Sequence, residues 1–98
     1  MIFNDVLQVK IVSPQENVFA GPALAVSSKN SAGNFDVLPE HANFITLIED
    51  QPIYIQKLDR QILTYRFALA IMHVNNNNVS IYTNINQAAS PEGFRRKE

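Results

Sequence analysis

The chain has 98 residues, of which 46% are hydrophobic and 17% are charged, a composition typical of a single globular domain. The formal net charge of −1 excludes the basic surface that nucleic-acid binding requires. The absence of cysteine excludes disulfides, thiolate catalysis and cysteine-ligated zinc. No apolar run is long enough to span a bilayer, so we expect no direct insertion into a membrane.

Short apolar runs separated by turn residues, at intervals of about eight to twelve residues, predict a fold made of strands. In the first run, Leu7, Val9 and Ile11 recur with a period of two, which is typical of a half-buried strand. The expected strands cover residues 6–12, 18–20, 23–29, 35–38, 44–48, 53–58, 62–74 and 79–83. The residues expected to line the core are Leu7, Val9, Ile11, Phe19, Val26, Phe35, Val37, Ile53, Ile55, Phe67 and Ile81.

Three interruptions of these runs are predicted from residue type. Gly21-Pro22 should end the second strand, because proline has no N–H for a ladder hydrogen bond. The long run at 62–74 should bend near Ala68–Ala70. The asparagines at 75–78 predict a hairpin tip, because asparagine tolerates left-handed backbone. Since no helical periodicity of useful length is present, we expect an all-β sandwich or barrel.

The most informative stretch runs from Gly33 to Thr46. A glycine that permits positive φ opens it, and a short strand follows, which Pro39 should end. Residues 40–43 then form a polar corner that contains an ionisable pair. An apolar run over residues 44–48 restarts the strand pattern.

This stretch resembles the N-terminal domain of the epsilon subunit of F-type rotary ATP synthases. The family pattern is Gly-x-Phe/Leu-Gly-Ile/Val-Leu-Pro-Gly-His-Ala-Pro, followed by two hydrophobic residues and Thr. The residues that match it in order and spacing are Gly33, Phe35, Val37, Leu38, Pro39, His41, Ala42, Phe44, Ile45 and Thr46. Asp36 and Glu40 stand where the family usually has glycine, and Asn43 where it has proline.

The resemblance covers about residues 5–84 and implies a flattened β-sandwich of two antiparallel five-stranded sheets. It divides the chain into a sandwich domain over 1–84 and a polar tail over 85–98. The family usually continues into two C-terminal helices, and this helical hairpin is expected to be absent here. Before the last hairpin, Leu69 and Ala70 replace two paired glycines of the family.

The resemblance further implies a non-catalytic subunit of the rotor's central stalk. Such a subunit docks on the gamma subunit and the c-ring and takes part in coupling proton or sodium transport to ATP synthesis. It would lie peripherally on the cytoplasmic side of an energy-transducing membrane. The alternative is a divergent, free-standing β-sandwich that binds an unknown protein, and the replaced glycines favour this alternative.

By resemblance, the residues that bind the c-ring or gamma are Asn34, Glu40, His41, Ala42 and Thr46. Asn34 and the corner are expected at one end of the sandwich, facing the c-ring, with gamma on an adjacent sheet surface. Two simpler interpretations stay open: His41 as a surface histidine bonded to the turn backbone, and Asn34 as a turn asparagine.

No catalytic, cofactor or metal site is expected. The acidic residues lie in separate turns, without the spacing of a catalytic pair. Glu40 and His41 are adjacent and would point apart on an extended chain, which makes a poor metal site. There is no phosphate-binding glycine loop, and no serine lies in a glycine elbow. We therefore expect that the chain is not an enzyme.

Overall fold

The computed structural model describes residues 5–83, in which the regular structure is entirely β. The strands are β1 (Leu7–Val12), β2 (Asn17–Ala23), β3 (Ala25–Asn30), β4 (Gly33–Val37), β5 (Phe44–Ile48), β6 (Pro52–Gln56), β7 (Ile62–Arg66), β8 (Ala70–Asn75) and β9 (Asn78–Thr83). No helix among residues 5–83 is long and apolar enough to cross a membrane. The expected polar tail at 85–98 lies outside the described residues.

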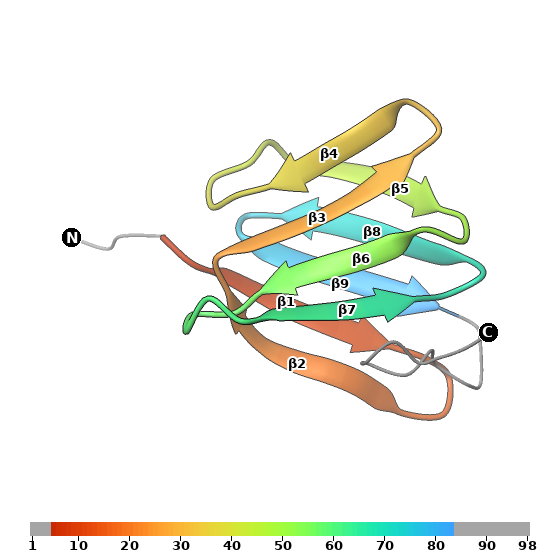
Figure 1. Ribbon diagram of the computed structural model, residues 1–98, viewed down its shortest axis with the longest axis horizontal. Coiled ribbons are helices and arrows are strands. Elements are labelled where there is room, and N and C mark those ends of the chain that lie inside the picture. The colour runs from red at the N-terminus through yellow and green to blue at the C-terminus, as the bar shows by residue number, and fades with distance from the viewer. Residues whose placement is uncertain (1–4, 84–98) are drawn as a thin grey trace.

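The strands form two sheets that pack face to face (Figure 1). One sheet has five strands in the order β2-β1-β9-β8-β5, and the other has four in the order β4-β3-β6-β7. The predicted sandwich is therefore confirmed, but the prediction of two five-stranded sheets is wrong. The prediction of purely antiparallel sheets is also wrong, because β1 pairs parallel with β9. This pairing joins the first and last strands in the middle of the larger sheet.

The second strand is longer than its proline suggested. β2 continues through Gly21 and Pro22 to Ala23, and Pro22 lies opposite Gln8 of β1. The prediction that Gly21-Pro22 ends this strand is wrong for a physical reason. β2 is an edge strand, and a proline is tolerated there when the N–H that it lacks would have faced solvent.

The long apolar run at 62–74 is two strands in different sheets. β7 ends at Arg66 in the smaller sheet, and β8 begins at Ala70 in the larger one. The bend predicted near Ala68–Ala70 is confirmed, and it carries the chain from one sheet to the other. The predicted hairpin tip is also confirmed, since Asn76 and Asn77 have φ values of 51° and 67°. Two left-handed residues are what a two-residue type I′ hairpin requires.

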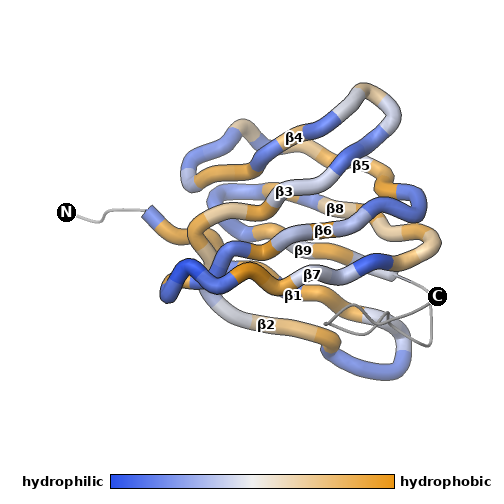
Figure 2. The backbone as a smooth tube through the Cα atoms, in the orientation of Figure 1, coloured by the Kyte–Doolittle hydropathy of each residue, from blue (hydrophilic) through white to orange (hydrophobic). Residues whose placement is uncertain are grey.

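The core lies between the two sheets, and nine of the eleven predicted core residues are buried. Phe19 and Phe35 are the exceptions, because they pack against the core but stay partly exposed at its margin. Met72 and Val74 of β8 and Val79 of β9 add to the core from the larger sheet. Figure 2 shows apolar residues along the strands and hydrophilic residues in most of the connecting turns.

Candidate functional site

The polar corner at residues 40–43 begins within one tight turn over residues 38–41. The backbone N–H of His41 donates to the carbonyl oxygen of Leu38 at 3.0 Å. Pro39 fixes its own φ near about −65°, and Glu40 has a φ of 68°. This combination is that of a type II turn, whose third position favours glycine. The glycine that the family carries at the Glu40 position is therefore explained by backbone geometry.

The corner is bonded to the tip of the β8–β9 hairpin. The backbone N–H of Glu40 donates to Oδ1 of Asn77 at 2.6 Å. The backbone N–H of Asn76 donates to Oδ1 of Asn43 at 3.0 Å. One asparagine from each loop thus satisfies a backbone donor of the other loop, so the corner and the tip form one unit at the same end of the sandwich (Figure 1).

His41 also uses much of its side chain within the chain. Its ring Nδ1 lies 2.6 Å from the carbonyl oxygen of Ala42, and because a carbonyl only accepts, Nδ1 carries the proton. Its ring packs on Phe44, with 5.0 Å between the ring centroids. This is the simpler interpretation of His41, a half-buried turn histidine, and it leaves Nε2 to meet a partner. Ala42 is exposed beside it and contributes only its backbone here.

Asn34 lies at the other end of the sandwich from the corner, which corrects the expectation that they share one end. Asn34 is near the start of β4, whereas Glu40 follows the end of that strand. The remaining β4 residues, at about 3.3 Å each, and then the turn separate the two. Figure 1 shows the β3–β4 turn and the corner at opposite ends. The sequence does not reveal this separation, because Asn34 and Glu40 are close together in the motif and only the strand between them carries them apart.

Thr46 belongs to the interior side of β5. It is half-buried, and its hydroxyl accepts a hydrogen bond from the side-chain amide of Asn30 on β3, at 2.8 Å. This bond joins the two sheets at the open side of the sandwich. The predicted site residues therefore fall in three places: the corner, the Asn34 end and the space between the sheets.

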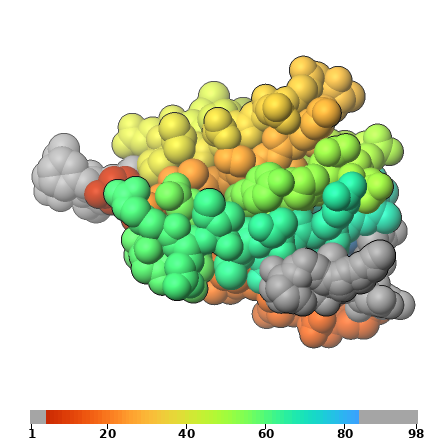
Figure 3. All heavy atoms as spheres, in the orientation of Figure 1, coloured from red at the N-terminus to blue at the C-terminus, as the bar shows by residue number. Residues whose placement is uncertain are grey.

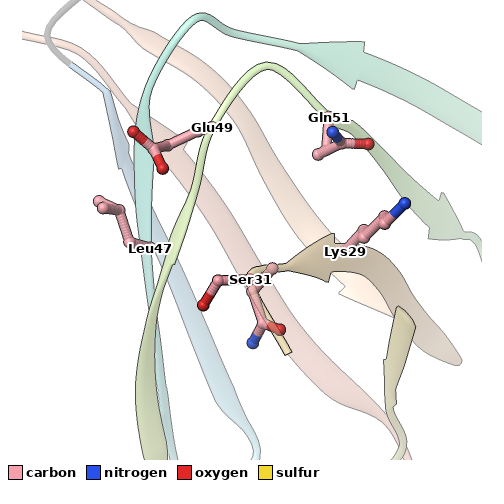
Figure 4. Close-up of a pocket in the computed structure, with 6 residues that line it drawn as sticks. Lys29, Ser31, Leu47, Glu49 and Gln51 are labelled. Atoms are coloured by element: carbon pink, nitrogen blue, oxygen red, sulfur yellow. The ribbon is translucent and has the colours of Figure 1, made fainter. Parts of the chain in front are cut away.

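The Asn34 end carries a shallow pocket of about 210 Å³ (Figure 4). Its lining residues come from the end of β3, the turn after it, the end of β5 and the loop to β6: Lys29, Asn30, Ser31, Leu47, Glu49 and Gln51. Within residues 5–83, the side chains of Lys29 and Glu49 make no hydrogen bond or ion pair. This end therefore presents two side chains of opposite charge to a partner, whereas the exposed charged side chain of the corner is that of Glu40 alone.

An exposed apolar row crosses the outer face of the five-stranded sheet. Leu47 of β5 lies opposite Ile71 of β8, and Ile71 lies opposite Tyr82 of β9. Ile45, two residues before Leu47 and on the same face of β5, is 67% exposed, and Leu47 is 46% exposed. We define the apolar row as Ile45, Leu47, Ile71 and Tyr82. The row was not predicted from the sequence. The available signal was that four of the five residues at 44–48 are apolar, including both that face outward, because a strand with one solvent-exposed face normally alternates between apolar and polar residues.

The described residues offer no constellation for metal chemistry. No group of three or more His, Asp or Glu side chains among residues 5–83 could hold an ion. The one ion pair in this part of the chain joins Arg66 to Asp50 at 3.0 Å, and both side chains are largely exposed. Such exposed pairs contribute little to stability.

Comparison with known proteins agrees with this geometry. Residues 6–89 match the family model described as ATP synthase, Delta/Epsilon chain, beta-sandwich domain. The chain is 31% identical over 75 residues to the ATP synthase epsilon chain of Sulfurimonas denitrificans, an alignment that covers 76% of this chain and 58% of that protein. The chain thus spans less than two thirds of the length of this relative.

Solved structures share the fold at low sequence identity. One is a chain of the Euglena gracilis mitochondrial ATP synthase, with a TM-score of 0.78, 17% identity and coverage of 87% of this chain and 53% of that one. Another belongs to the central stalk and c-ring of the Tetrahymena thermophila mitochondrial ATP synthase, with a TM-score of 0.67, 9% identity and coverage of 81% and 63%. The family model covers most of the chain, and the chain therefore belongs to the ATP synthase delta/epsilon family, with residues 6–89 as its beta-sandwich domain.

Proposed function

We propose that this chain acts as a non-catalytic, epsilon-type subunit in the central stalk of a rotary ATP synthase. In this role it docks on the gamma subunit and the c-ring and takes part in coupling proton or sodium transport to ATP synthesis. It lies peripherally on the cytoplasmic side of the energy-transducing membrane. The observation that carries the proposal is the family match over residues 6–89, supported by relatives that are epsilon chains.

The gamma subunit docks on the outer face of the five-stranded sheet, over the apolar row. Adjacent exposed apolar side chains that form one patch are typical of protein-binding surfaces. In this row, Leu47, Ile71 and Tyr82 are direct cross-strand neighbours. On the opposite face, formed by β4, β3, β6 and β7 (Figure 3), the exposed Tyr54 instead has Ser27 and Thr64 as its cross-strand neighbours. That face is therefore less suited to a large apolar contact.

The c-ring meets the Asn34 end and not the corner. At the corner, the backbone N–H of Glu40 and Nδ1 of His41 already have partners within the chain, which leaves the Glu40 carboxylate as its one exposed charged group. At the Asn34 end, Lys29 and Glu49 have none among residues 5–83. Charged and polar groups that are free in the isolated chain are suited to contact a polar loop of a partner. Such contacts fix how the two surfaces align more than they add affinity.

The free-standing binding module remains the second candidate, since four glycine positions of the family pattern are replaced. Only one of those four residues has the backbone geometry that favours glycine. Glu40 has positive φ, whereas Asp36, Leu69 and Ala70 do not. Three of the four replacements therefore need no left-handed backbone, which weakens the case for a different docking surface.

The test measures binding of the chain to the purified gamma subunit of the same organism, by calorimetry or sedimentation. Leu47→Lys places a charge in the apolar row and should weaken binding roughly tenfold or more. Tyr54→Lys is the matched control, because Tyr54 is 43% exposed on the opposite face and Leu47 is 46% exposed. The control should bind like the unmodified chain. No binding by the unmodified chain would support the free-standing module instead.

A further inference from the structure

The two sheets have four edge strands, and these are not equally protected. β2 and β5 border the five-stranded sheet, and β4 and β7 border the four-stranded sheet. An edge strand presents unpaired N–H and C=O groups to which another chain can add a strand. Proteins commonly block such edges with proline, a charged side chain or a bulge. An unblocked edge is therefore informative.

Three of the four edges carry such a block. β2 contains Pro22, and its pairing with β1 is broken by a register shift at Ile11/Val12. β4 carries the exposed carboxylate of Asp36, and β7 ends with the exposed guanidinium of Arg66. Each of these features disfavours addition of a further strand.

β5 has none of these features. Its five residues, Phe-Ile-Thr-Leu-Ile, include no charge and no proline, and its pairing with β8 runs without a register shift. No strand in residues 5–83 pairs with its other side. Beside this bare edge lie Ile45 and Leu47, the two β5 members of the apolar row. The free edge and the exposed apolar side chains thus coincide on one strand.

The register identifies which backbone groups face the free edge. Just beyond β5, the N–H of Asp50 donates to the carbonyl oxygen of Ala68 at 3.0 Å, in the same register as the β5–β8 pairs. Hydrogen-bonded and non-bonded pairs alternate in an antiparallel ladder. Thr46 and Ile48 therefore bond to β8, whereas the N–H and C=O groups of Ile45 and Leu47 point away from it, toward the free edge.

The strand order at this edge favours a single added strand over a second copy of the domain. β5 lies across from β3, as the Asn30–Thr46 hydrogen bond shows. β4 is the neighbour of β3 on the outer side and extends past the β5 edge. A second copy that paired through its own β5 would bring its own β4 into this space. A single extended segment avoids this overlap.

We propose that an extended, uncharged segment of the gamma subunit adds to β5 as a sixth strand of the larger sheet. This inference rests on the proposed function and specifies how gamma is held. The segment exchanges backbone hydrogen bonds with Ile45 and Leu47, and its outward side chains extend the apolar row. Backbone pairing gives affinity in this mode of recognition, and alternate side chains give specificity.

Hydrogen exchange of the isotope-labelled chain, measured by NMR with and without purified gamma subunit, tests the proposal. In the free chain, the amides of Ile45 and Leu47 should exchange quickly, and that of Thr46 slowly. On binding, the first two should slow by roughly 100-fold or more, because new backbone hydrogen bonds protect them. Thr46, which already bonds to β8, is the internal control and should change much less.

The other outcomes distinguish a failure of strand addition from a failure of the proposed function. If gamma binds but Ile45 and Leu47 exchange as before, or if Thr46 slows equally, gamma covers the face without adding a strand and the inference is overturned. If gamma does not bind at all, the proposed function fails, and the inference fails with it.

Discussion

The backbone N–H of Glu40 donates to the side-chain oxygen of Asn77 at 2.6 Å, across a sequence separation of 37 residues. This bond ties the turn after β4 to the tip of the β8–β9 hairpin. It holds Glu40 in a left-handed conformation that a non-glycine residue rarely adopts. The corner is therefore positioned by a contact from a distant part of the chain.

Replacing the strained residue by glycine should stabilise the domain. Glu40→Gly removes the cost, about 1–2 kcal/mol, of holding a non-glycine residue in left-handed backbone. Glycine also increases the entropy of the unfolded chain, which offsets part of this gain. We therefore expect a net increase of roughly 0.5–1 kcal/mol in the free energy of unfolding. Asp36→Gly is the control at the other family glycine of the motif. It has no positive φ to relieve, and it loses the hydrogen bond from Ser27 at 2.6 Å. Urea denaturation should show opposite signs for the two variants, and equal losses would contradict the argument from strain.

The asparagine tip gives a second matched pair. Asn76 and Asn77 both have positive φ, but of the two only Asn77 accepts the Glu40 N–H through its side chain. Asn76→Gly should be neutral or slightly stabilising. Asn77→Gly should be less stable than Asn76→Gly by about 1 kcal/mol, because the Glu40 donor loses its acceptor. Indistinguishable unfolding curves would show that the bond does not hold the corner.

A core truncation tests the sandwich itself. Phe67 is 3% exposed, and its ring stacks on that of Tyr65 with 6.2 Å between centroids. Phe67→Ala should reduce the free energy of unfolding by roughly 3–5 kcal/mol. Leu69→Ala, two residues away in the exposed β7–β8 connection, should cost much less. Similar losses from both would show that Phe67 is not part of a packed core.

Stability should also decline at high pH because of one buried tyrosine. Burial raises the pKa of the Tyr65 hydroxyl above its usual value of 10.0. The unfolded chain then releases this proton at a lower pH than the folded chain. The stabilisation is fully present below pH 10 and is lost as the pH rises above it toward the folded pKa. Tyr65→Phe should flatten this decline in denaturation curves collected across that range, and an unchanged slope would assign it to other groups.

Local sequence rules predicted most of the strands but not all the strand pairings. The range of β5 was predicted as observed, because an apolar run between two turns has few alternatives. The extension of β2 through Pro22 was missed, since its tolerance depends on an edge position that only the sheet order defines. The parallel β1–β9 pair joins opposite ends of the described region, and no local pattern specifies it.

The motif drew attention to particular residues but did not predict their geometry. The motif led to His41 and Glu40, but not to the positive φ of Glu40, which a turn and a distant asparagine impose together. It also grouped Asn34 with the corner, although β4 carries them to opposite ends. The apolar row was not apparent, because its members come from β5, β8 and β9 and become neighbours only in the sheet.

We propose that this domain is held in the rotor with its Asn34 end toward the c-ring. Disulfide crosslinking in the assembled ATP synthase of the same organism tests it most directly. Asn34→Cys should crosslink to a cysteine placed in the polar loop of the c-ring, and His41→Cys should not. A complex that contains the chain, but in which neither cysteine crosslinks to the c-ring or to gamma, would contradict the claim. A crosslink to the c-ring from His41→Cys alone would reverse the orientation.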